Sequence, residues 1–194
     1  MKKLIPLLLA ASLGGCISFG AKPPSQLLTI DATAQLPPGT TQSSASSATM
    51  TVLIPTVPHE LATTRIPVHA RGVAIAYVKD AVWSEAPPRL FARVLGDTIA
   101  ARTGRVILSY RQSLHDPGAV LSGELRMFGV DATTNEAVVT YDAVLGRGGD
   151  EPVFEKRRFE ARVPVTPIEA EPVAAALQSA ANQVAEQVSD WVGK

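Results

Sequence analysis

The residues with the most reactive side chains are one cysteine, Cys16, and three histidines, His59, His69 and His115. A lone cysteine can form no disulfide within the chain, so the fold must depend on packing. The histidines have no second histidine or carboxylate at a metal-ligand spacing, and the zinc-protease motif H-E-x-x-H is absent. We therefore predict neither a metal site nor a cofactor.

Two short glycine-containing stretches resemble catalytic motifs only superficially. Ser122-Gly123 lacks the leading glycine of a nucleophile elbow. Gly146-Arg147-Gly148-Gly149 lacks the Gly-Lys-Ser/Thr ending of a phosphate-binding loop and indicates a hairpin. His115-Asp116 precedes Pro117-Gly118, a composition typical of a surface turn. No stretch of the sequence therefore indicates a catalytic residue.

The densest run of charge is Lys156-Arg157-Arg158. In a strand, successive side chains point to opposite faces, so Lys156 and Arg158 share one face with Arg162. This face could bind phospholipid headgroups or an acidic partner. A solvated strand face is the simpler interpretation, and the one we favour from sequence alone.

Cys16 lies at the end of an export signal. Lys2 and Lys3 precede an apolar run from Leu4 to Leu13, which at about 1.5 Å per residue is too short to span a bilayer. Leu13-Gly14-Gly15-Cys16 then matches a lipobox, the cleavage and acylation pattern of bacterial lipoproteins. We predict cleavage between Gly15 and Cys16 and lipidation of Cys16. An ordinary secretory signal with an incidental cysteine is the alternative.

The residue after the cysteine bears on sorting. Ile17 stands where an inner-membrane retention signal would have aspartate, which favours a periplasm-facing anchor in the outer membrane. Removal of residues 1–15 takes away two lysines and leaves two more acidic than basic residues. We therefore expect no nucleic-acid partner.

The 194 residues are enough for a single domain with a hydrophobic core. We predict a signal peptide at 1–15 and a lipidated tether at 16–50, with a short first strand at 27–30 and a Ser/Pro-rich loop. The domain should occupy 51–194.

Within that domain we expect early strands at 51–54, 66–70, 72–78 and 106–108. We also expect an antiparallel meander at 120–130, 137–145 and 153–165, with one wetted face. In its third strand, Val153, Phe159, Ala161 and Val163 should face the core.

Apolar spacing of three and four predicts two helices. One begins near Arg89, with Ser84 as a possible N-cap, and ends before Gly104. The other runs from about Glu171 to Val192. The predicted fold is α+β, with an antiparallel or mixed sheet and two helices packed on one face.

Several short motifs follow one another in a characteristic order along most of the mature chain. They are Leu27–Ile30, Thr51–Pro58 before Leu61, Arg71–Tyr77 leading to Trp83, Pro87 with the Leu90–Leu95 helix, Gly123–Phe128, Phe154–Phe159 and the closing Ser189-Asp190-Trp191. In this order they resemble the ABC-type transport auxiliary lipoprotein family, the lipoprotein components of MCE and Pqi systems. Leu28 stands where such proteins commonly carry tyrosine.

The resemblance implies a non-catalytic role. Such lipoproteins anchor at the outer membrane through an acylated cysteine, here Cys16. They dock the periplasmic conduit that MCE-domain proteins form for lipid or another hydrophobic solute. The expected partners are an MCE-domain protein and outer-membrane lipid, with a homo-oligomer possible. Two other hypotheses stay open, a lipid-anchored periplasmic hydrolase and a scaffold lipoprotein of another envelope assembly.

Overall fold

The long antiparallel meander forms the centre of the fold in the computed structural model, which describes residues 26–71, 73–116, 118–148 and 153–193. β5 (Ala119–Asp131), β6 (Glu136–Arg147) and β7 (Val153–Pro164) pair in order, antiparallel throughout. Alternate residues of β5 and β6 are fully buried on the face that meets the helices. The predicted meander is confirmed.

The four shorter strands extend the sheet along the other edge of β5. β1 (Thr49–Val52) pairs in parallel with the start of β5 and with β4 (Val106–Leu108). β2 (Arg65–His69) pairs in parallel with the end of β5 and antiparallel with β3 (Ile75–Val82). Among the described residues the sheet therefore has seven strands of mixed direction.

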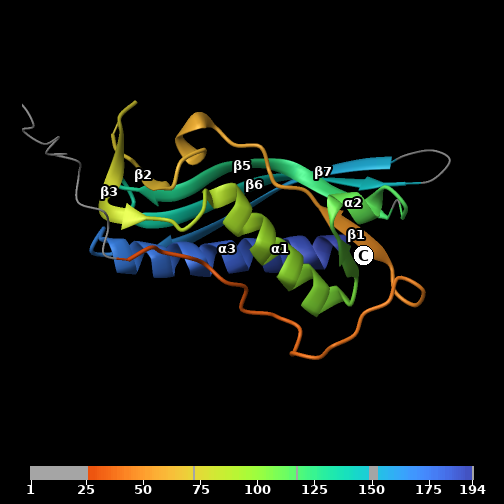
Figure 1. The fold of residues 1–194 in the computed structure, drawn as a ribbon. Helices are drawn as coiled ribbons and strands as arrows, with labels where there is room; N and C mark the ends of the chain where they lie inside the picture. The colour runs from red at the N-terminus through yellow and green to blue at the C-terminus, as the bar shows by residue number, and fades with distance from the viewer. Residues whose placement is uncertain (1–25, 72, 117, 149–152, 194) are drawn as a thin grey trace, which may run out of the picture.

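Two helices cover one face of this sheet, as Figure 1 shows. α1 (Pro87–Thr103) and α3 (Ala170–Val192) pack on each other and against the meander. The apolar stripe of α3 is buried, and Trp191 packs against Phe159 with ring centroids 5.5 Å apart. The predicted α+β class, with two helices on one face of a single domain, is confirmed. Two short helices, η1 (His59–Leu61) and α2 (Tyr110–Ser113), were not predicted.

The C-terminal end of α1 was predicted correctly, but its N-cap was not. Gly104 closes the helix with φ of 70°, and its N–H donates to the carbonyl of Ala100 at 3.1 Å. Ser84 is not the N-cap; Ala86 occupies that position. The N–H of Ser84 donates instead to the carbonyl of Leu28 at 2.8 Å, which holds it in an extended segment beside Trp83.

One inward-facing assignment in β7 was wrong. Phe159 and Ala161 are buried as predicted and Val163 is partly buried, but Val153 is 54% exposed. The reason is the length of α3, which ends at Val192 beside Phe159. The β6–β7 ribbon continues past the end of α3, as Figure 1 shows, so α3 does not cover Val153.

Part of the predicted tether packs on the domain. Leu28 forms only an isolated bridge to Trp83 instead of the expected strand. Ile30 is fully buried, and Asn182 on α3 binds the chain that follows. Its Oδ1 accepts from Thr33 N–H at 2.7 Å and its Nδ2 donates to the Asp31 carbonyl at 3.0 Å. The predicted boundary between residues 15 and 16 lies outside the described residues.

Candidate binding surface

The face of β5, β6 and β7 that points away from α1 and α3 carries the candidate site, and we call it the outer face. The register aligns three rows of side chains across it, from the β6–β7 turn inward: Val120, Gly146 and Phe154; Ser122, Val144 and Lys156; Glu124, Asp142 and Arg158. Strand alternation places each row on one face. Apolar and cationic positions therefore follow one another along β7.

A groove of about 770 Å³ lies over the second and third rows. One side is β7, and the other is the segment after β1, which stays beside β5 through hydrogen bonds from Leu53 N–H to the Leu121 carbonyl and from Thr56 N–H to the Gly123 carbonyl. Leu53, Val144 and Ile54, which is 52% exposed, supply apolar surface to the groove. Its volume is in the range of small-molecule sites.

The carboxylates of the groove are bound to arginines. Arg158 forms a two-point ion pair with Asp142, with Nη2 2.7 Å from Oδ2. Arg126 lies 3.2 Å from Glu124 and 3.6 Å from Asp142. The hydrogen bond from Arg158 is the main cause that lowers the pKa of Asp142, with smaller contributions from the charges of Arg158 and Arg126. These four groups balance in charge.

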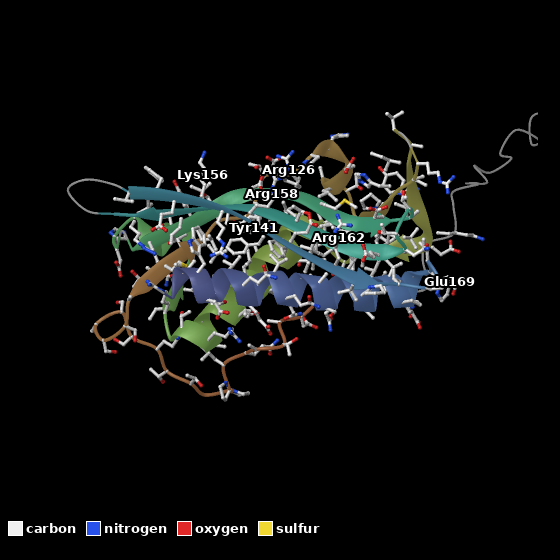
Figure 2. The ribbon with its side chains drawn as sticks, turned by 180° about the vertical axis from the view of Figure 1, so that it is seen from behind. Arg126, Tyr141, Lys156, Arg158, Arg162 and Glu169 are labelled. Atoms are coloured by element: carbon white, nitrogen blue, oxygen red, sulfur yellow. The ribbon has the colours of Figure 1, made fainter. Side chains whose placement is uncertain are left out.

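Two further cations line the groove without such a partner. In the part of the chain that the structure describes, neither Lys156 nor Arg157 has a carboxylate oxygen within 4.0 Å. Lys156 projects from the outer face near Arg126 and Arg158, as Figure 2 shows. Arg157 starts from the opposite face of β7, where its guanidinium lies 5.0 Å from the Phe159 ring. Lys156 therefore gives the outer face of the groove a positive charge without an ion-pair partner among the described residues, whereas the charge of Arg157 lies on the opposite face.

A smaller hollow of about 240 Å³ continues the outer face toward the β6–β7 turn. Phe154, 69% exposed, lies opposite Gly146, and a β-carbon at Gly146 would approach its ring to 3.1 Å. Val120 lines the same hollow. The glycine thus leaves space for the aromatic ring beside an apolar surface.

At the other end of the outer face, Arg162 forms ion pairs with three carboxylates. Arg162 lies 2.7 Å from Glu160, 3.2 Å from Glu136 and 3.6 Å from Asp131. The hydrogen bond from Arg162 lowers the pKa of Glu160, and Thr140 adds to the effect. The predicted shared face of Lys156, Arg158 and Arg162 is confirmed. Of these three cations only Lys156 is left without an ion-pair partner among the described residues.

Of the other residues considered in the sequence, Ser122 and Gly123 line the groove and Gly146 lines the hollow, whereas His69 lies elsewhere. His69 Nε2 lies 3.0 Å from Glu60 Oε1 beside η1, and the described residues contain no group of three or more potential metal ligands. Gly146 and Arg147 belong to β6, as expected of a hairpin. Cys16 and Gly15 lie outside the described residues, so lipidation and cleavage stay predictions. No helix in the described ranges has the length and apolarity needed to cross a membrane.

Sequence reasoning identified the cations of this surface but missed its apolar floor. The signal for Val144 was present, because it alternates with buried neighbours on β6. Leu53 and Ile54 had no such signal. They were assigned to a strand, but β1 ends at Val52, and their position depends on the parallel pairing of residues distant in sequence.

A family model and two solved structures each match most of this chain. The family model described as "ABC-type transport auxiliary lipoprotein component" matches residues 29–189. A solved structure from Xanthomonas campestris of the DUF330 family is 19% identical with a TM-score of 0.65, and the match covers 86% of this chain and 93% of that one. An uncharacterized protein is 14% identical with a TM-score of 0.64, over 84% of this chain and 99% of the other. No curated protein matches.

Proposed function

The chain belongs to the family of ABC-type transport auxiliary lipoprotein components, and from this premise we propose that it serves an MCE-type system that moves lipid or another hydrophobic solute between the inner and outer membranes. In this role it is a non-catalytic component that docks the periplasmic conduit at the membrane. The ATPase and permease of the system supply the energy and the inner-membrane passage.

The observation that carries this proposal is the outer-face groove. One face of the sheet is buried under α1 and α3, while the other presents an apolar floor with surplus positive charge. An exposed apolar groove with convergent polar groups is typical of a binding surface. The carboxylates in it, Asp142 and Glu124, are each bound by an arginine. This arrangement supports recognition of a partner or cargo.

The anchor in this proposal is Cys16, acylated after cleavage behind Gly15 and held in the outer membrane facing the periplasm. Several acyl chains hold a protein firmly, at about 0.8 kcal/mol per buried CH₂. Labelled palmitate should appear on the wild-type chain and be lost in Cys16→Ala. A Ser12→Ala variant, which leaves the lipobox intact, is the matched control. Label that persists in Cys16→Ala would contradict the anchor.

Co-purification tests the transport role. Affinity isolation of the tagged full chain from its native envelope, after mild crosslinking, should recover an MCE-domain protein. Recovery should fall when Ile54 and Lys156 on the groove are both replaced by glutamate. Replacement of Gln183 and Gln187, on the exposed side of α3, should have no such effect. Recovery of a different envelope assembly, with no MCE protein, would refute the proposal.

A further inference from the structure

The groove and the hollow lie on consecutive rows of the outer face, and together we call them the strip. Phe154 lines the hollow, Lys156 and Arg158 line the groove, and all three are on the outer face of β7. At about 3.3 Å per residue, Phe154 and Arg158 lie roughly 13 Å apart along the strand. The strip is therefore apolar beside the β6–β7 turn, carries the unpaired cation Lys156 next along β7, and ends at the charge-balanced pair of Arg158 and Asp142.

This polarity matches a molecule with an apolar tail and an anionic head. We propose that the strip binds one anionic glycerophospholipid, with an acyl chain over Phe154, Gly146 and Val144 and the phosphate at Lys156. The proposal rests on the proposed function and names its cargo-binding site on this chain.

Charge supports the placement of the phosphate. Arg158 and Arg126 are already paired with Asp142 and Glu124, so they add little net charge. Lys156 has no carboxylate within 4.0 Å among the described residues, and its ammonium is a compact donor suited to a phosphate oxygen.

The floor of the strip favours a lipid over an extended acidic peptide. The backbone of β6 is paired on both sides, with β5 from Val120 to Asp131 and with β7 from Val153 to Pro164. The face of a fully paired sheet offers few free backbone donors or acceptors, and a peptide lying on it would leave its own amides without partners. An acyl chain has no such groups and gains from burial of apolar surface.

Photo-crosslinking in cells tests this site. The full chain carries p-benzoylphenylalanine in place of Phe154, or of Val144, in cells grown with [³²P]phosphate. The acyl anchor contains no phosphorus, so radioactivity on the crosslinked chain reports a captured phospholipid. We expect label at both positions and none when the photoreactive residue replaces Gln187 on the exposed side of α3.

The charge is tested by variants in the Phe154 background. Lys156→Glu should reduce the label about tenfold or more, because it removes a charge-assisted contact and adds repulsion. Lys156→Arg should retain the label, and Lys79→Glu, at an exposed lysine on β3, should leave it unchanged. Circular dichroism on the purified chains checks that each variant folds.

Three results would overturn the inference. They are the absence of any ³²P label at Phe154 and Val144, a crosslink to a protein segment in place of a lipid, and a captured species that mass spectrometry identifies as lipopolysaccharide. Recovery of the MCE-domain protein is measured in the same cells. Absence of the lipid label in the photoreactive chains that keep Lys156, with retained MCE recovery, refutes only this inference, whereas failure of the wild-type chain to recover the MCE-domain protein refutes the proposed function.

Discussion

The hydroxyl of Tyr141 should stabilise the fold by an amount that can be measured without disturbing the packing around it. Tyr141 is fully buried between the sheet and α3, as Figure 2 shows, and its hydroxyl donates to the Ser122 carbonyl at 2.7 Å. Burial raises the pKa of Tyr141 above its usual range, so the hydroxyl stays protonated and remains a donor. Tyr141→Phe removes this donor and keeps the ring.

The expected loss follows from the two groups involved. A hydrogen bond of this kind contributes about 0.5–1.5 kcal/mol to stability. The edge-to-face contact with Phe91, at 5.3 Å between centroids, is unchanged by the substitution. We therefore expect Tyr141→Phe to lower the free energy of unfolding by about 0.5–1.5 kcal/mol, or roughly 1–6 °C in Tm for a domain of this size.

Urea titration followed by tryptophan fluorescence provides the assay, because Trp83 and Trp191 are both buried and report the core directly. The slope of the transition should not change, since the surface exposed on unfolding is the same. Tyr110→Phe is the matched control, because that side chain is 67% exposed and its loss should stay within about 0.5 kcal/mol. Equal effects of the two variants would refute this account of Tyr141.

Three further predictions concern the backbone, the ion pairs and the N-terminal segment. Gly123→Ala should destabilise the domain by about 2 kcal/mol or more in the same titration, because φ is 150° and the new β-carbon would lie 2.1 Å from the Asp142 carbonyl oxygen. Arg158 lowers the pKa of Asp142, so this pair stabilises the fold above about pH 4 and is lost as pH falls through the lowered pKa. Arg158→Gln should make the acid-induced loss of stability between about pH 5 and pH 3 shallower. Asn182→Ala should accelerate amide hydrogen exchange at Thr33, whose N–H donates to Asn182 at 2.7 Å.

Each of these predictions has a control. Gly104→Ala also places alanine at a positive φ but meets no atom within 4 Å, so its smaller effect isolates the clash at Gly123. Arg102→Gln removes an exposed ion pair with Asp190 and should not change the acid-induced loss of stability in the same way. Gln183→Ala, on the exposed side of α3, should leave exchange at Thr33 unchanged. A steeper acid transition in Arg158→Gln would contradict the linkage argument.

The sequence predicted the elements whose periodicity is long and regular. The stripe of α3 repeats over six turns and the meander alternates over three strands, so local pattern and tertiary packing agree. Gly104 was predictable as a helix end because only a residue that tolerates positive φ serves there well.

What could not be predicted depends on contacts between distant residues. The burial of Ile30 depends on α3, about 150 positions later, and the exposure of Val153 depends on where α3 ends. Only some of the residues that line the groove could be predicted from the sequence. Its cations follow from strand alternation, whereas Ile54 reaches it only because the chain after β1 stays beside β5.

The position of β7 has a consequence for solubility. Among the described residues β7 pairs only with β6, so the outer edge of a 12-residue strand is left without a neighbouring strand. Long free edges with few charges are templates for association between copies of a chain. Here Lys156, Arg158, Glu160 and Arg162 alternate along the edge and keep it hydrated. Lys156 and Arg158, which border the groove, therefore also oppose strand-to-strand aggregation together with Glu160 and Arg162. Apolar substitutions among these four should lower the concentration at which the protein precipitates.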